Sequence, residues 1–156
     1  ASVRHLLPKP VDRFVLRIAN RLRHHWRQIA KPQLHAVTVL VRDDQGRVLF
    51  IRHSYGPPGW TLPGGGIVLG EPPAEAARRE IREELSLDLP DLALLATFEE
   101  TVSGAPQTAH VFAGTANAQP RPDGREVVEA RFFAPEGVPG QISALTRRRL
   151  AILAES

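Results

Sequence analysis

Residues 64–87 place three consecutive glycines shortly before a segment with a strong helical pattern. The residues from Pro72 onward are good helix formers, and Pro72 and Pro73 stand where the first turn of a helix tolerates proline. This pattern predicts a helix from about Pro73 to about Leu85. At about 100° per residue, one narrow arc becomes the expected buried face, and it contains Ala74, Ala77, Ile81 and Leu85.

Three carboxylates share the flank beside this face, because Glu80, Glu83 and Glu84 are spaced i, i+3 and i+4. Exposed like charges at these spacings repel by about 0.2 to 0.5 kcal/mol per pair, and Arg79 relieves only part of that repulsion. A hard divalent cation binds carboxylate oxygens together with substrate phosphates. Nearby glycine backbone can approach such an ion closely. A metal-assisted phosphate site is therefore predicted, with a solvated, salt-bridged helix as the alternative.

The spacing of the polar residues favours the phosphate site. Gly65 is followed after five residues by Glu71, and after seven more by the run Arg79-Glu80-Ile81-Arg82-Glu83-Glu84-Leu85-Ser86-Leu87. This pattern resembles the signature of the Nudix hydrolases, and its chance occurrence in such a chain is on the order of one in 10⁵. The one departure is Ser86, where the family has a glycine that ends the helix as a left-handed cap. A residue other than glycine costs roughly 1 kcal/mol there.

The resemblance implies a reaction and the residues that perform it. Nudix enzymes hydrolyse a nucleoside diphosphate linked to another moiety, through attack of water on phosphorus. By similarity, the catalytic residues would be Arg79, Glu80 and Glu83. Arg79 would orient the carboxylates by ion pairing, and Glu80 is the first candidate for the general base.

The resemblance also implies a metal ion, Mg²⁺ with Mn²⁺ as a substitute. Its oxygen ligands would come from Glu80, Glu83, Glu84 and the carbonyl of Gly64 or Gly65. Glu71 would steady the loop before the helix. Outside the signature, the alternative candidates for the base are Glu126 and Glu129.

The substrate is predicted less directly. Residues expected to approach it are Arg52, His53, Tyr55 and Gly65, on the ground that loops often carry function. Residues 101–104 carry neither the proline of ADP-ribose enzymes nor the tyrosine of dinucleoside polyphosphate enzymes. A nucleoside or deoxynucleoside triphosphate is therefore the expected substrate. ADP-ribose, a nucleotide sugar and the 5′ end of RNA are alternatives, and a non-catalytic nucleotide sensor is an alternative of another class.

The order of elements predicts one α/β domain over residues 34–153. Strands are expected at residues 34–41, 48–51, 92–98, 108–115 and 127–133, with a hairpin joining the first two. A last helix is expected at residues 141–153, with Arg147, Arg148 and Arg149 as a solvated patch. Strands mixed with helices imply a mixed sheet with helices packed on it. This agrees with the α/β/α sandwich that the resemblance implies.

Residues 1–31 lie outside that likeness and carry eight Lys or Arg residues against one acidic residue. Apolar residues recur there at helical spacing, so a basic amphipathic helix is predicted. Packing on the domain or in a homodimer interface is the first interpretation. Contact with a membrane surface or with nucleic acid, and a targeting segment, are the others.

The composition excludes some classes of function. The 156 residues, 42% of them hydrophobic, suffice for one domain with a proper core. The absence of cysteine excludes disulfides, thiolate metal sites and a cysteine nucleophile. The sequence lacks both a long uninterrupted apolar stretch and the pattern of a secretory signal, so a cytoplasmic location is expected.

Overall fold

The computed structural model describes residues 34–56 and 58–155, so the helix predicted over residues 1–31 lies outside the described residues. The elements follow one another as strands, helix, strands and helix. In chain order they are β1 (Leu34–Arg42), β2 (Val48–His53), β3 (Gly64–Gly66), α2 (Pro73–Leu85), β4 (Ala93–Val102), β5 (Ala105–Thr115), β6 (Val127–Phe133), the 3-10 helix η2 (Pro135–Gly137) and α3 (Ala144–Ala154).

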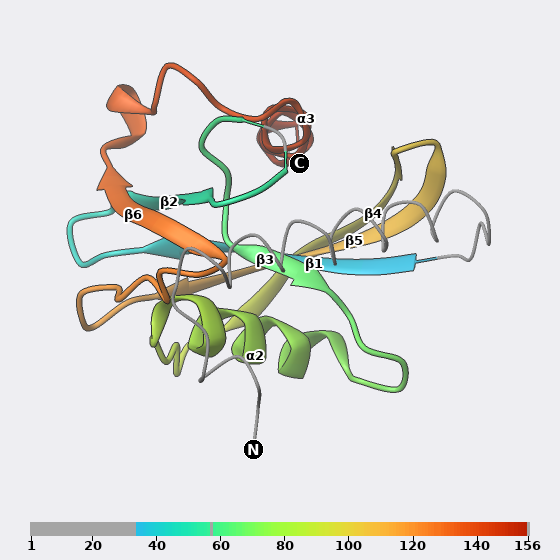
Figure 1. Ribbon diagram of the computed structural model, residues 1–156, viewed down its shortest axis with the longest axis horizontal. Coiled ribbons are helices and arrows are strands. Elements are labelled where there is room, and N and C mark those ends of the chain that lie inside the picture. The colour runs from blue at the N-terminus through green and yellow to red at the C-terminus, as the bar shows by residue number, and fades with distance from the viewer. Residues whose placement is uncertain (1–33, 57, 156) are drawn as a thin grey trace.

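Strand β1 lies at the centre of a mixed sheet with the order β4-β5-β1-β2-β6, and β3 pairs with β1 beside this path. β1 runs parallel to β5 along its whole length. It meets β2 only at Arg42 and Val48, because β3 occupies the same edge of β1 farther back and β2 turns away to pair with β6 (Figure 1). The predicted hairpin is thus a tight connection without a long paired ladder.

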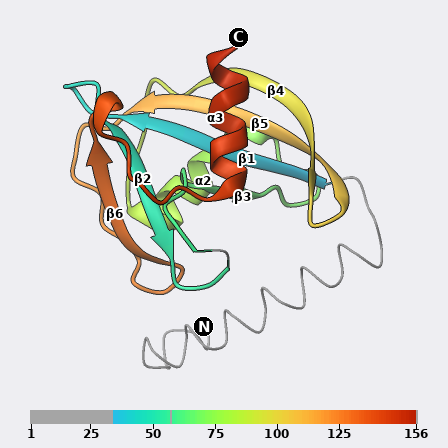
Figure 2. The same cartoon turned by 90° about the horizontal axis from the view of Figure 1, so that it is seen from above.

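The two helices cover opposite faces of the sheet, as Figures 1 and 2 show from two directions. Successive residues of β1 point to opposite faces, so Val39 joins Ile81 of α2 in one apolar cluster, while Leu40 joins the other. Leu150 of α3 packs against that second cluster. The predicted α/β/α arrangement around a mixed sheet is confirmed.

The structure differs from the sequence-based expectation mainly where strands end. β4 and β5 extend toward one another until only Ser103 and Gly104 remain between them, both with positive φ (53° and 77°). Such a two-residue turn matches the twist of the flanking strands. β3 was not expected from the sequence, because glycine has little strand propensity. Pairing with β1 holds its three glycines extended.

The prediction that Arg149 belongs to a solvated patch is wrong. Arg147 and Arg148 are exposed, but the side chain of Arg149 is only 11% exposed and forms an ion pair with Glu100 of β4, Nη2 to Oε2 at 2.6 Å. Consecutive residues of a helix point in different directions, so one of the three arginines faces the sheet. Among the described residues, no helix is long and apolar enough to cross a membrane.

Candidate functional site

Helix α2 carries the carboxylates, and its inner face anchors them to the sheet. Ala77, Ile81 and Leu85 are buried as predicted, whereas Ala74 is only half-buried. Ser86 ends the helix with φ 54° and ψ 37°, and its backbone N–H donates to the carbonyl of Arg82 at 3.0 Å. The helix ends at Leu85 as predicted, and Ser86 adopts the left-handed conformation that the family's glycine would have, even though serine replaces glycine.

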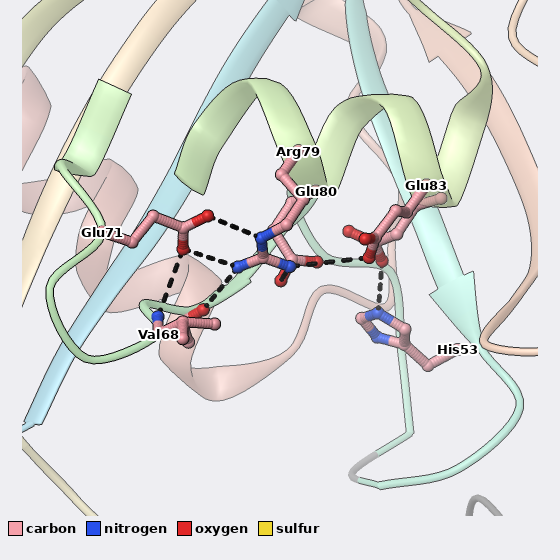
Figure 3. A network of polar contacts seen from close by, with 8 residues as sticks. His53, Val68, Glu71, Arg79, Glu80 and Glu83 are labelled. Atoms are coloured by element: carbon pink, nitrogen blue, oxygen red, sulfur yellow. Dashed lines mark hydrogen bonds and ion pairs between the residues drawn. The ribbon is translucent and has the colours of Figure 1, made fainter. Parts of the chain in front are cut away.

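Arg79 joins the loop to the helix through several polar contacts (Figure 3). Its guanidinium binds Glu71 in two places, Nε to Oε2 at 2.8 Å and Nη2 to Oε1 at 3.0 Å. Nη1 donates to Oε1 of Glu80 at 3.0 Å and reaches Oε2 of Glu83 at 3.5 Å, and Nη2 donates to the carbonyl of Gly66 at 3.2 Å. The hydrogen bond from Arg79 lowers the pKa of Glu71. The arginine therefore joins the loop to Glu80 and also reaches the exposed Glu83.

Glu71 also closes the loop on itself. Its Oε1 accepts a hydrogen bond from the backbone N–H of Val68 at 3.2 Å, as Figure 3 shows. Glu71 thus binds both Arg79 and the loop backbone, which agrees with the expectation that it steadies the loop before the helix.

Glu80 fits against the backbone of β3. A Cβ atom on Gly65 would lie 2.6 Å from Oε1 of Glu80, so the carboxylate needs the space that the glycine leaves. The side chain of Glu80 is 12% exposed. Burial, and then the charge of Glu84, raise the pKa of Glu80 to about 7.

Glu84 is the most deeply buried of the three carboxylates. Its side chain is 2% exposed, against 62% for Glu83. Oε2 lies 3.2 Å from Nε2 of His53, and Oε1 is buried without a hydrogen bond from any described residue. Burial raises the pKa of Glu84 well above its usual range, and the charge of Glu126 adds to this effect. A buried, unpartnered carboxylate oxygen is costly unless a cation binds it.

His53 brings the end of β2 to this cluster. Its ring centroid lies 5.7 Å from that of Tyr55, and burial lowers its pKa, which favours the neutral imidazole. The sequence placed His53 in a loop near the substrate. The structure places it at the last position of β2, against Glu84.

A loop far along the chain completes the surroundings of Glu84. Arg121 and Asp123 donate backbone N–H groups to the carbonyls of Leu85 and Glu84 at 2.8 and 3.0 Å, and so satisfy the end of α2. The charges of Asp123 and Glu126 therefore act on Glu84 and His53. Sequence reasoning missed Asp123, because its only signal was the Asp-Gly turn pattern.

Arg52 and Glu129, which the sequence offered as a substrate-binding residue and a possible base, do not reach this cluster. Nε of Arg52 forms an ion pair with Oε1 of Glu129 at 3.1 Å, and its guanidinium lies over the ring of Trp60, 5.4 Å from the centroid. Trp60 packs on the apolar cluster that α3 covers, whereas Glu84 belongs to α2 on the other face. The alternation of side chains along β2 explains why Arg52 points away from its neighbour His53.

An open pocket of about 460 Å³ adjoins the site. His53, Tyr55 and the glycines of β3 line it, and so do Gln107 of β5 and Arg148 of α3. Within the part of the chain that the structure describes, no three His, Asp or Glu side chains form a ready-made metal cluster. The pair Glu80 and Glu84 nevertheless offers what a hard cation needs, namely desolvated carboxylate oxygens, one of them unpartnered.

Comparison with known proteins places this geometry in a family. The NUDIX domain matches residues 32–154. An RNA pyrophosphohydrolase of Halorhodospira halophila is 44% identical over 59 residues, which are 38% of this chain and 32% of that protein. An ADP-ribose pyrophosphatase of Mycobacterium tuberculosis is 33% identical over 84 residues, 51% of this chain and 41% of that protein. The matches thus span roughly a third to two fifths of these curated relatives.

Solved structures agree with the fold. The MutT NUDIX hydrolase from Burkholderia pseudomallei superposes with a TM-score of 0.68 at 27% identity, covering 77% of this chain and 97% of that one. The NUDIX domain of Shewanella oneidensis NrtR, complexed with ADP ribose, gives a TM-score of 0.68 at 19% identity over 80% of this chain and 87% of that one. At that identity, the second likeness concerns the fold alone.

Proposed function

Because the chain belongs to the Nudix family, we propose that it hydrolyses the pyrophosphate of a nucleoside diphosphate linked to another moiety. The observation that carries this proposal is the buried, unpartnered Oε1 of Glu84 beside Glu80. Burying two carboxylates side by side gives a protein no stability, and the charge of Glu84 raises the pKa of Glu80. A cation bound together with an anionic substrate would neutralise the charge of both Glu80 and Glu84.

The proposed metal is Mg²⁺, with Mn²⁺ as a substitute. The residues that would hold it are Glu80, Glu83 and Glu84, with the carbonyl of Gly64 or Gly65. When bound, such an ion neutralises phosphate charge and lowers the pKa of water. The protein contributes fixed positions for two of these carboxylates, because Arg79 holds Glu80 and His53 holds Glu84, whereas Glu83 is 62% exposed and lies 3.5 Å from Arg79.

The general base we propose is Glu80, whose pKa of about 7 in the metal-free protein shows how far its surroundings favour a bound proton. Glu126 is the alternative, because its charge acts on both Glu80 and Glu84. Glu129 is a weaker candidate, because its oxygens are engaged by Arg52 and Arg131 at 3.1 and 3.0 Å.

For the substrate we propose a nucleoside or deoxynucleoside triphosphate first. The relatives named RNA pyrophosphohydrolase and ADP-ribose pyrophosphatase make the 5′ end of RNA and ADP-ribose the next candidates. The volume of the pocket, about 460 Å³, is within the usual range for small-molecule sites.

The test is cleavage of nucleoside triphosphates, nucleotide sugars, ADP-ribose, dinucleoside polyphosphates and 5′-triphosphorylated RNA, followed by chromatography of the products. Nucleotide sugars and ADP-ribose would yield a nucleoside monophosphate and a sugar phosphate, whereas a nucleoside triphosphate would release phosphate or pyrophosphate. Each compound is incubated with Mg²⁺ and, in parallel, with a chelator. Metal-dependent cleavage of one class, lost in Glu84→Gln, supports the proposal. Tight binding without cleavage across the panel would replace it by a nucleotide sensor.

A further inference from the structure

A buried glutamine lies in the wall of the pocket, on a different strand from the residues assigned to catalysis. Gln107, near the start of β5, is 4% exposed and is one of the pocket-lining residues. A buried side-chain amide carries both a donor and an acceptor that need partners. Its orientation therefore determines what the pocket offers to a ligand.

The orientation of the Gln107 amide is fixed by a neighbouring ion pair. Nε2 of Gln107 donates to Oε2 of Glu100 at 2.6 Å. Arg149 binds the same carboxylate in two places, Nε to Oε1 at 3.1 Å and Nη2 to Oε2 at 2.6 Å. A carboxylate paired with an arginine only accepts hydrogen bonds, so the amide must turn its nitrogen toward Glu100. Chemistry thus excludes the flipped amide.

The other end of the amide is left for a ligand. Oε1 of Gln107 accepts no hydrogen bond from the described residues. Unlike Oε1 of Glu84, this oxygen is not sealed from solvent. Because Gln107 lines the pocket and Glu100 binds its Nε2, Oε1 is the polar atom of this amide that remains for a ligand, and it is an uncharged acceptor.

We propose that Oε1 of Gln107 selects the 6-amino group of adenine over the 6-oxo group of hypoxanthine, or the 4-amino group of cytosine over the 4-oxo group of uracil. The inference rests on the proposed function, in that the nucleoside of the substrate occupies this pocket. An amino group donates to the oxygen, whereas an oxo group at the same position brings two acceptors face to face. A site built to bind one hydrogen-bonding group rejects the analogue that lacks it.

The first experiment measures binding of four nucleoside monophosphates by titration calorimetry, because these compounds contain no pyrophosphate to cleave. AMP is compared with IMP, and CMP with UMP, since each pair differs at the amino or oxo position. The amino member of at least one pair is expected to bind about tenfold more tightly. The pair that shows the preference identifies the base. Equal affinity in both pairs, tighter binding of the oxo members, or no binding of any of the four overturns the inference.

The second experiment replaces the acceptor. Gln107→Met keeps the length of the side chain but removes its amide, namely the oxygen and the nitrogen that donates to Glu100, and should reduce the preference to about twofold or less. Gln45→Met makes the same exchange at an exposed residue of the turn after β1 and should leave the preference unchanged. A preference that survives in Gln107→Met overturns the inference. If that variant does not fold, Gln107→Asn replaces it, because the shorter amide withdraws the oxygen from the pocket, and an undiminished preference in Gln107→Asn overturns the inference.

The two proposals fail in different ways. Hydrolysis of pyrophosphate compounds without any amino preference would contradict the role of Gln107 and leave the proposed activity standing. An amino preference in binding, together with no hydrolysis of any compound in the panel, would do the opposite.

Discussion

A methyl group on Gly65 would lie 2.6 Å from Oε1 of Glu80 and 2.7 Å from its carboxyl carbon. Separations this short force one of the two groups to move. Gly65 is held in the sheet opposite Val37, while Glu80 is held by Arg79, so neither moves freely. The glycine is thus required for the space it leaves rather than for an unusual backbone angle.

Gly65→Ala should therefore displace the carboxylate of Glu80 and lower kcat/KM by about tenfold or more, because small displacements of positioned groups are costly in catalysis. The measurement is steady-state hydrolysis of the best substrate in the panel. Gly140→Ala is the matched control, because a Cβ atom there meets nothing within 4 Å. Equal activity of both variants would show that Glu80 has no critical position.

Glu84→Gln should abolish turnover and, in the presence of chelator, leave the protein at least as stable as the unchanged chain. The amide cannot ionise in its buried position but can keep the contact with His53. Thermal unfolding with chelator and with Mg²⁺ tests both statements, and the rise in Tm caused by Mg²⁺ should shrink in the variant. Full Mg²⁺-dependent activity in Glu84→Gln would refute the metal assignment.

The metal-free protein should lose stability as the pH rises. The pKa of Glu80 is about 7 in the fold, against 4.5 for an ordinary glutamate. The folded pKa is the higher one, so this contribution is fully present below about pH 4.5 and is lost as the pH rises to about 7. With chelator, the unchanged protein should lose roughly 1 to 3 kcal/mol relative to Glu80→Gln over this range. Parallel pH profiles of the two proteins would contradict this expectation.

Ser86→Gly should stabilise the protein by up to roughly 1 kcal/mol, because Ser86 occupies the left-handed conformation at the end of α2. The greater freedom of glycine in the unfolded chain offsets part of the gain. Urea unfolding gives the measurement. Ser86→Ala is the control and should not stabilise, since alanine keeps the Cβ atom. A destabilised glycine variant would mean that the hydroxyl of Ser86 contributes more than the conformation costs.

Arg149→Met should destabilise the fold by about 3 to 5 kcal/mol, because it leaves the carboxylate of Glu100 buried without its cation. Arg147→Met, two residues earlier on the exposed side of α3, should change stability by less than about 0.5 kcal/mol. Chemical denaturation of the two variants provides the comparison. Similar, small losses in both would mean that water reaches the Glu100 pair.

The sequence predicted those features that depend on neighbours along the chain. The helix Pro73–Leu85 was predictable because proline starts, apolar spacing and a left-handed end all lie within a few turns. The sequence also placed Glu80, Glu83 and Glu84 on one flank. It could not show that Glu84 is sealed while Glu83 stays in solvent, because His53 and the loop at Asp123 produce that difference from distant positions.

Contacts between residues far apart in the chain also explain why the sequence-based predictions for Arg52 and Arg149 were wrong. Arg52 was expected near the substrate, but the pairing of β2 with β6 gives it Glu129 as a partner. In the sequence, Arg149 cannot be told apart from the exposed Arg147 and Arg148. In the structure, it is Arg149 among these three that forms an ion pair with Glu100 of β4. A single sequence contains the residues of such pairs without the register that joins them.

The parallel pairing of β1 with β5 has a consequence for the order of folding. The partner of β1 lies about seventy residues later in the chain, and β1 has hardly any ladder with its immediate successor β2. During synthesis, helix α2 and its carboxylates emerge while one edge of the central strand is still unpaired. Long-range closure of this kind slows folding and leaves an open edge to be protected. The sheet can close only once residues 105–115 have left the ribosome.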